Sequence, residues 1–445
     1  MHRSPRRAFV TGLVAAAALA PCLPAVAAGG GDAARGRTKL VSATPAGAPG
    51  NGASTNLRTS ADGRHIAFLS DAGDLVPGDT NGVADVFVRD LRTGRTERVS
   101  VASDGAQSDA GSGSLGVSRD GRVVAFVSSA GNLAPGGAGG IFVHDRRTGE
   151  TRRVSPPDRP SDGGPASFSY APQLSADGRY VAFTSNAAAL SPGEPAPGPD
   201  NRYQAYVHDL RTGRTERAST AADGSRADRD ARPTALSADG RLVSLTTRAT
   251  NLVPGDTNDE EDVFVRDRRT GRTERISVAD DGAEVPSHRG DLGGGALSAD
   301  GRYAVFESGG DALVAGDTND TTDVFVRDRR RGTTERVNLS AAGGQLAYRS
   351  IWSDISGSGR YVSFATYDPG VVPGDTNGRF DVFLRDVARG STQRISLGEG
   401  GAQPDGDSIV SSLDHRGRTV AFGSLAGNLA RGDTNDAPDV FARLR

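Results

Sequence analysis

The residues of this chain that could bind a metal ion occur in a short loop motif that is repeated five times. The motif is Gly-Asp-Thr-Asn, and each copy has an aspartate, an asparagine two residues later and a second aspartate six residues after the first. Oxygen ligands at alternate positions of a tight loop suit a hard cation such as calcium. The candidate calcium ligands are Asp79, Asn81, Asp85, Asp256, Asn258, Asp262, Asp317, Asn319, Asp323, Asp375, Asn377, Asp381, Asp433, Asn435 and Asp439.

A purely structural role explains the same motif. Aspartate and asparagine are common in turns because their side chains imitate backbone hydrogen bonds. The loop is also two residues shorter than the Asp-x-Asp-x-Asp-Gly type of calcium loop. Two equivalent places in the chain provide an internal comparison. One is the glycine-rich stretch Gly136–Gly140, and the other has Asp200 and Asn201 but Gln204 as its third member. Both interpretations stay open, and these two loops should hold no metal under either.

A second group of residues has the composition of a binding hot spot. Trp352 is the only tryptophan in the chain, and Tyr348 and Arg349 lie close to it in sequence. Tyrosine, tryptophan and arginine dominate the energetics of many interfaces. Burial of Trp352 against a neighbouring structural unit is the alternative, because tryptophan is usually well buried.

The elements that position these residues come from a repeat of about 60 residues. The turn Ser-x-Asp-Gly-Arg, or a variant of it, returns at intervals of 57 to 62 residues. The repeated turn begins at Ser60, Ser118, Ser175, Ser237, Ser298, Ser356 and Asp414. Each repeat holds four short apolar or β-branched runs separated by turn residues, which predicts a four-stranded antiparallel meander.

Phenylalanine occupies two fixed places in the repeat, in the second and third expected strands. These two columns contain 12 of the 15 phenylalanines. A large ring at one place in every unit fits sheets that pack face to face around an axis. The sequence therefore predicts an all-β fold, a seven-bladed β-propeller of four-stranded antiparallel blades over residues 36–445. The last repeat lacks a fourth strand, and residues 36–42, Gly-Arg-Thr-Lys-Leu-Val-Ser, match the end of the first. We therefore expect the N-terminal segment to close the ring.

The segment Ser-Ala-Asp-Gly-Arg-Tyr-Val-Ala-Phe-Thr-Ser, residues 175–185, resembles the repeat of TolB-like, WD-repeat-related propellers. The resemblance covers roughly residues 36 to 445. It implies a propeller fold, but little about activity, since that family includes scaffolds, partner-binding domains and accessory domains of enzymes.

Residues 1–28 resemble an export signal peptide. Three arginines precede the apolar run 9–19, and small residues at 25–28 offer a cleavage site. Arg6 and Arg7 suit a twin-arginine signal, with the general secretory route as the alternative, and Cys22 leaves lipid attachment open. Residues 29–35 would form a short linker. The mature chain would carry a net charge of −6, since the signal removes three arginines and no acid from a total of −3.

These features predict a secreted, non-enzymatic scaffold. The variable loops between the second and third strands, and between blades, would lie on one face and bind a protein or cell-envelope polymer. We expect a monomer with no transmembrane segment, and the acidic mature charge with dispersed arginine argues against nucleic acid. No nucleophile elbow or zinc-binding histidine pattern occurs. The alternative is an exported lyase or glycan hydrolase whose residues converge on the central channel.

Overall fold

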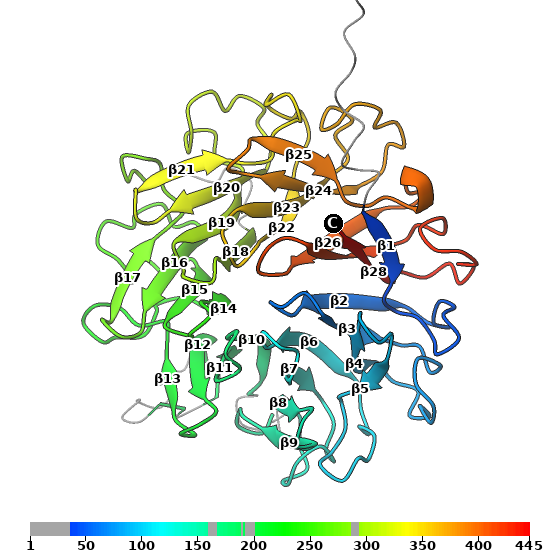
Figure 1. The fold of residues 1–445 in the computed structure, drawn as a ribbon. Coiled ribbons are helices and arrows are strands. Elements are labelled where there is room, and N and C mark those ends of the chain that lie inside the picture. The colour runs from blue at the N-terminus through cyan, green and yellow to red at the C-terminus, as the bar shows by residue number, and fades with distance from the viewer. Residues whose placement is uncertain (1–35, 159–166, 188–189, 192–200, 286–292) are drawn as a thin grey trace, which may run out of the picture.

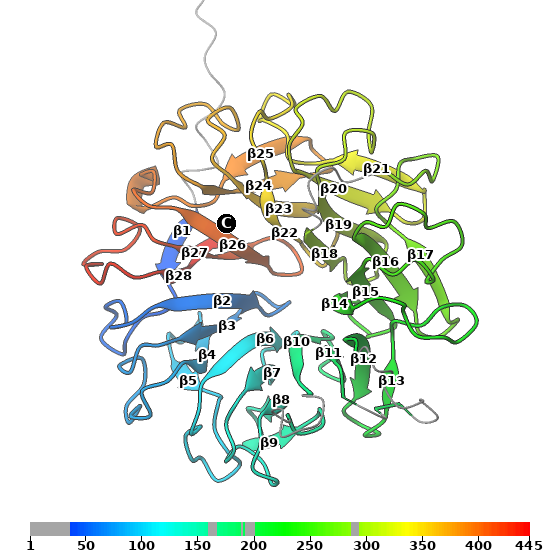
Figure 2. The same cartoon turned by 180° about the vertical axis from the view of Figure 1, so that it is seen from behind.

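In the computed structural model, seven four-stranded antiparallel sheets surround a central opening (Figures 1 and 2). The structure describes residues 36–158, 167–187, 190–191, 201–285 and 293–445. The expected signal peptide at 1–28 and linker at 29–35 lie outside them. The single helical element described is a short 3₁₀ turn, η1 (Glu399–Gly401). The predicted seven-bladed, all-β propeller is therefore confirmed.

The blades are numbered here in chain order, and their strands run from the central opening outward. Blade one contains β2 (Ser54–Thr59), β3 (His65–Ser70), β4 (Asp85–Asp90) and β5 (Thr96–Arg98). Blade two contains β6 (Ser112–Val117), β7 (Val123–Ser128), β8 (Gly140–Asp145) and β9 (Glu150–Arg153). Blade three contains β10 (Ser169–Leu174), β11 (Tyr180–Ser185), β12 (Gln204–Asp209) and β13 (Thr215–Arg217). Blade four contains β14 (Ala231–Leu236), β15 (Leu242–Thr247), β16 (Asp262–Asp267) and β17 (Arg272–Arg275).

The remaining blades follow the same pattern. Blade five contains β18 (Gly293–Leu297), β19 (Tyr303–Ser308), β20 (Asp323–Asp328) and β21 (Thr333–Arg336). Blade six contains β22 (Ile351–Ile355), β23 (Tyr361–Thr366), β24 (Asp381–Asp386) and β25 (Ser391–Arg394). Blade seven contains β26 (Ser408–Leu413), β27 (Thr419–Ser424), β28 (Asp439–Leu444) and, as its outer strand, β1 (Arg37–Leu40).

The ring is closed by the N-terminal strand, as the sequence predicts. Strand β1 pairs antiparallel with β28 over the register Arg37↔Leu444 to Leu40↔Phe441. In Figure 1 the blue β1 lies beside the red β28, so the two ends of the described chain meet in one blade. This pairing covers the edge that β28 would otherwise expose.

The two phenylalanine columns form the core of each blade. Phe68 and Phe87 stack with ring centroids 5.9 Å apart, and both side chains are fully buried. The cores also cross between neighbouring blades, since Val86 and Val88 of blade one pack with Leu115 of blade two. Burial of these apolar runs between successive sheets is what holds the ring together.

The Ser-x-Asp-Gly-Arg turn has a second role that links two strands. The Ser60 hydroxyl donates a hydrogen bond to Asp62, while the Arg64 guanidinium forms two bonds to Asp90 at the end of β4, of 3.1 and 2.6 Å. The guanidinium and nearby backbone amides hold the pKa of Asp90 well below its usual range. The same arginine–aspartate pair recurs in blades two to six. The arginine of the Ser-x-Asp-Gly-Arg turn therefore has a structural role, because it holds the aspartate at the end of the third strand.

Candidate functional site

The hydrogen-bonded register places the variable loops at one edge of each sheet. In blade six, Ile351 at the start of the innermost strand pairs with Ala365 near the end of the second, and Thr366 pairs with Asp381 at the start of the third. The entry to each blade and the loop between its second and third strands therefore share one face of the disc. We call this the long-loop face.

The predicted binding residues meet on this face as part of a larger aromatic cluster. Phe380, directly before β24, lies at its centre. The ring of Trp352 lies 5.8 Å from that of Phe380 at an interplanar angle of 62°, and the ring of Tyr367 lies 5.0 Å away at 71°. Tyr348 packs on Tyr367 at 4.8 Å, and the Arg349 guanidinium lies 5.8 Å from the Phe380 ring centre. These five residues are named the blade-six cluster.

The blade-six cluster is exposed to solvent. Trp352, Tyr348 and Tyr367 have 39%, 44% and 36% of their surface exposed, and Arg349 is also exposed. Burial of Trp352 between blades, the alternative considered from the sequence, is not what the structure shows. Exposed aromatic side chains that gather in one place are typical of a binding surface.

The backbone at Trp352 has a left-handed conformation. Its φ angle is +56°, within a β-bulge where the register between β22 and β23 shifts. The other innermost strands carry similar bulges, and the equivalent residues Asn56, Ala171 and Val410 also have positive φ. The conformation is therefore a feature of the bulge that these innermost strands share.

A buried carboxylate holds the outer part of the cluster in place. Asp368, directly after Tyr367, accepts hydrogen bonds of 2.5 and 3.1 Å from the backbone amides of Ala347 and Tyr348. It also accepts one of 2.7 Å from Gly370. The two tyrosines are therefore fixed relative to each other by one side chain, which lowers the entropy that a ligand has to overcome.

Blade three has a related aromatic contact that uses Tyr203, the equivalent of Phe380, with the residue equivalent to Ile351 in place of the one equivalent to Trp352. Tyr170 of β10 packs against Tyr203, directly before β12, with centroids 5.2 Å apart at 68°. Phe168 and Tyr170 are exposed. We call Phe168, Tyr170 and Tyr203 the blade-three cluster. The sequence prediction missed Phe380, Tyr367 and all of this cluster. Alignment of the repeats would have found Tyr203 and Phe380, since the other blades have Ala, Gly, Glu, Thr or Pro at that place.

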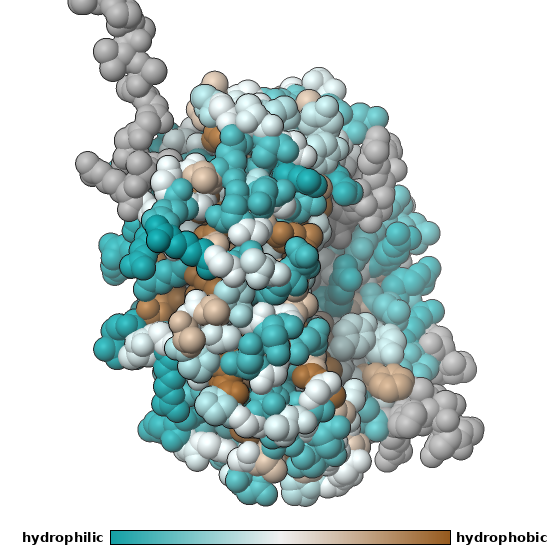
Figure 3. Space-filling view, turned by 90° about the vertical axis from the view of Figure 1, so that its right-hand side faces the viewer, coloured by the Kyte–Doolittle hydropathy of each residue, from teal (hydrophilic) through white to brown (hydrophobic). Residues whose placement is uncertain are grey.

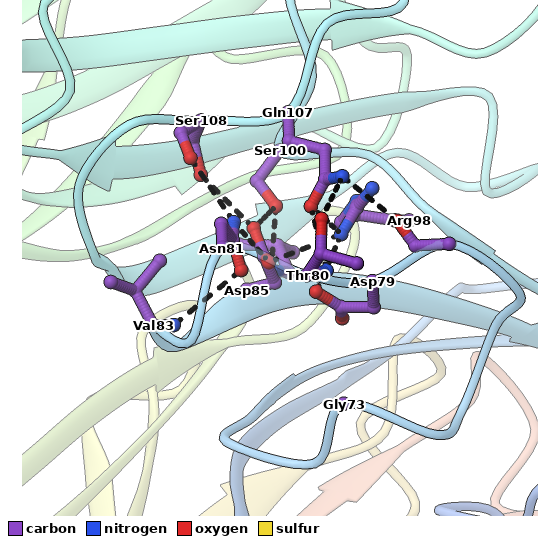
Figure 4. A network of polar contacts seen from close by, with 12 residues as sticks. Gly73, Asp79, Thr80, Asn81, Val83, Asp85, Arg98, Ser100, Gln107 and Ser108 are labelled. Atoms are coloured by element: carbon purple, nitrogen blue, oxygen red, sulfur yellow. Dashed lines mark hydrogen bonds and ion pairs between the residues drawn. The ribbon is translucent and has the colours of Figure 1, made fainter.

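The Gly-Asp-Thr-Asn loops are filled by a network of side chains from the same blade (Figure 4). In blade one, the Arg98 guanidinium lies 2.8 Å from Asp79 and 3.5 Å from Asp85. Asn81 directs its amide nitrogen, not its oxygen, toward Asp85 at 2.8 Å. The Ser100 hydroxyl donates to the other oxygen of Asp85. The cation that the two carboxylates face is therefore an arginine of β5.

Blades four, five and six contain the same arrangement with Arg275, Arg336 and Arg394. Burial and the neighbouring carboxylate outweigh the arginine in blade four, where they raise the pKa of Asp256 to about 6. The pKa of Asp317 in blade five is likewise raised to about 6, first by burial and then by Asp323. In these two loops, two or more carboxylates share one guanidinium, so the arginine does not offset burial and carboxylate repulsion.

Blade seven departs from this pattern. Its outer strand is β1, in which Leu40 occupies the position of the arginine. Asp439 still accepts hydrogen bonds from Ser42 and from the Asn435 amide nitrogen at 2.5 and 3.1 Å. Burial, with a contribution from Asp433, raises the pKa of Asp439 to about 6. This blade therefore keeps the two carboxylates without the guanidinium.

The calcium prediction for these loops stays a prediction. Within the described ranges, no group of three or more histidine, cysteine, aspartate or glutamate side chains is arranged to hold a metal ion. In the loops of blades one, four, five and six, the asparagine directs its amide nitrogen toward the aspartate. The guanidinium of the arginine already contacts the carboxylate oxygens that a metal ion would need. This arrangement fits calcium poorly and favours the interpretation of the loops as turn structure.

The innermost strands contribute a pair of opposite charges. The charged residues Arg58 of β2 and Asp354 of β22 belong to innermost strands, and Asp354 accepts hydrogen bonds from the backbone amides of Leu413 and Ile355. His144 and His208 lie far out in their blades and contact Thr151 and Thr215 of the outer strands. Neither of these two histidines belongs to an innermost strand.

Comparisons with known proteins identify the fold and no closer relationship. No protein-family model matches the chain, and no curated protein is significantly similar in sequence. The β-propeller domain of the Trilobed protease from Pyrococcus furiosus is 11% identical, with a TM-score of 0.51 over 88% of this chain and 93% of that one. An oligogalacturonate lyase in complex with manganese is 12% identical, with a TM-score of 0.52 over 92% and 96%.

TolB from Acinetobacter baumannii is also similar, at 12% identity, a TM-score of 0.40 and coverage of 87% and 78%. Identities this low indicate a shared fold alone. The seven-bladed architecture itself is shown by the strand order of the sheets, and TolB proteins are among the solved structures that resemble the chain. Among the residues described, no helix has the length and hydropathy of a membrane span.

Proposed function

We propose that the protein is an exported, non-enzymatic scaffold that binds a protein or a cell-envelope polymer through its long-loop face. The observation that carries the proposal is the blade-six cluster, in which exposed aromatic rings and an arginine surround Phe380. The side of the disc seen in Figure 3 is mostly hydrophilic, with small and separate hydrophobic areas. Exposed aromatic side chains that gather at one place are typical of a binding protein.

The export part of this proposal depends on residues 1–28. Their arginines, apolar run and small residues have the order of a signal peptide. The test is the location of the full-length protein in cells compared with a variant that has Arg6→Lys and Arg7→Lys. Retention of the variant in the cytoplasm would support twin-arginine export, and an unchanged distribution would contradict it.

The binding test is capture of envelope components by the purified protein that begins at Gly36. The double variant Tyr348→Ala/Trp352→Ala should lose capture, since its large side chains leave the cluster. Leu425→Ala is the matched control, because Leu425 is exposed and follows β27 as Tyr367 follows β23. Equal capture by the wild type and the double variant would overturn the assignment of the site.

An exported lyase or glycan hydrolase is the second candidate. It is favoured by the similarity in fold to an oligogalacturonate lyase over nearly the full length of both chains. The residues that such an enzyme would place at the axis are Arg58 and Asp354. Cleavage of polygalacturonate by the wild type that is abolished in Asp354→Asn would establish it, and the absence of any cleavage would remove it.

A further inference from the structure

Two aromatic clusters lie on the long-loop face, in blades three and six, on opposite sides of the central opening. In each, a residue of the innermost strand packs at a steep angle on a ring that directly precedes the third strand, Tyr170 on Tyr203 and Trp352 on Phe380. Strands β10 and β22 face each other across the opening in both views (Figures 1 and 2). An extended ligand could contact both clusters at once.

The exposed apolar side chains of the described residues are almost all aromatic. The large exposed ones are Phe168, Tyr170, Tyr348, Trp352, Tyr367 and Leu425. An aromatic ring has a negative face, which attracts the partly positive C–H groups on the flat face of a pyranose ring. Surfaces that bind protein helices commonly add aliphatic side chains, and here Leu425 alone is aliphatic. The composition therefore favours a chain of sugars.

The charges beside the blade-six cluster indicate what that sugar carries. Arg349 and Arg379 are exposed, and within the described ranges neither guanidinium has a carboxylate partner. The nearby acids are already satisfied, since Asp368 accepts amide hydrogen bonds and Asp407 accepts one of 3.0 Å from the backbone of Phe380. Two available guanidinium groups beside stacking rings suit a ligand with carboxylates, which arginine binds through two parallel hydrogen bonds.

We propose that the blade-six and blade-three clusters together bind a polysaccharide whose sugar units bear carboxylates. The inference rests on the proposed binding function and specifies its ligand. Stacking on Trp352 and Tyr367 would supply affinity for the sugar rings, and Arg349 and Arg379 would select the acidic form. The blade-three cluster would hold a more distant part of the same polysaccharide chain. The affinity of the whole polymer would then exceed that of either contact alone, because one ligand links the two sites.

The test is affinity electrophoresis of the protein that begins at Gly36, in gels that contain polygalacturonate or dextran. Polygalacturonate should retard the wild type, while dextran should retard it weakly. Trp352→Ala should weaken polygalacturonate binding by about tenfold, which corresponds to about 1.4 kcal/mol. Arg349→Gln should reduce binding of polygalacturonate but not of dextran. Tyr170→Ala should weaken binding of the long polymer more than that of a short oligomer.

Two controls separate the outcomes. Leu425→Ala should bind as the wild type does, and circular dichroism of each variant should show the wild-type melting temperature. Retardation by neither polymer would overturn the inference, as would equal binding by Trp352→Ala. If envelope proteins are then still captured in a Trp352-dependent way, the proposed function survives and only the ligand is wrong. If the wild type neither captures envelope components nor is retarded by either polymer, both proposals are wrong.

Discussion

Arg98 and Leu40 occupy the same place in two blades of the ring. Each pairs with the phenylalanine of a third strand, Arg98 with Phe87 and Leu40 with Phe441. Arg98 reaches the two aspartates of its loop, while Leu40 leaves Asp433 and Asp439 without a cation from the outer strand. Pro49 likewise stands where blade one has Gln107, which accepts a hydrogen bond of 3.0 Å from Arg98. Blade seven, closed by β1, therefore lacks the arginine network that blades one, four, five and six contain.

Replacement of Arg98 by methionine should destabilise the protein. The variant keeps the length of the side chain but leaves Asp79 and Asp85 buried with no neutralising charge. Removal of one partner from a buried ion pair costs about 3–5 kcal/mol. Unfolding in urea at pH 7 measures the loss. Arg153→Met is the matched control, since the described hydrogen bonds of Arg153 go to the carbonyls of Ala138 and Pro135, and the neighbouring Asp158 forms no ion pair with it among the contacts described. A similar loss in both variants would contradict the role given to the carboxylates.

Replacement of Leu40 by arginine should restore the missing cation in blade seven. The guanidinium would lie near Asp433 and Asp439, and we expect the pKa of Asp439 to fall from about 6 toward its ordinary value. Titration of the carboxyl resonances by NMR measures that pKa. Leu40→Met adds no charge and should leave it unchanged. An Asp439 pKa that stays near 6 in Leu40→Arg would show that the arginine does not reach the site.

Mild acid should stabilise the protein. Burial raises the pKa of Asp256, Asp317, Asp381 and Asp439 to about 6 in the folded state, above the unfolded value of 3.8. Such groups bind protons more tightly when folded, so stability should rise as the pH falls from 7 through 6 toward 4.

Further acidification should reverse this gain. The arginine partner depresses the pKa of Asp90, and the stability that this pair contributes is lost below the unfolded pKa near 3.8. The free energy of unfolding, measured from pH 3 to pH 8, should therefore be highest between about pH 4 and 5. A maximum above pH 7 would be inconsistent with the raised pKa values.

Removal of the closing strand should open the ring. A protein that begins after Ser42 lacks β1 and the Ser42 hydroxyl that donates to buried Asp439, and β28 becomes an exposed edge. We expect a lower melting temperature and a tendency to aggregate, compared with the protein that begins at Gly36. The point variant Ser42→Ala should lose about 1–3 kcal/mol for the unsatisfied carboxylate. Unchanged thermal unfolding of the truncated protein would show that the ring does not depend on this strand.

Chelation should leave the melting temperature unchanged, because a guanidinium already lies beside the carboxylates in four of the five loops, and in the fifth Asn435 turns its amide nitrogen toward Asp439. Thermal unfolding in calcium and in excess chelator measures this directly. A higher melting temperature in calcium would support the original calcium prediction. If calcium did not raise the melting temperature of the Leu40→Arg variant, the ion would be assigned to blade seven.

The architecture could be predicted from the sequence because it follows from short local motifs that recur along the chain. The turn at Ser60, the phenylalanine columns and the match of residues 36–42 to the end of the first repeat give strand number, blade number and closure. The prediction of Trp352, Tyr348 and Arg349 as neighbours also depended on their proximity in the chain. Phe380 was missed because it lies 28 residues from Trp352, and the register of β22, β23 and β24 is what brings them together.

By itself, the sequence determined the ring, since a strand needs only its own alternation and turns to form, and seven copies impose seven blades. The tertiary structure decided what the aspartate loops face and which rings share a surface. Charge balance and ring contact depend on side chains from different strands, such as Arg98 opposite Asp79. Strand register determines which side chains meet, and the two members of each contact come from different segments of the chain.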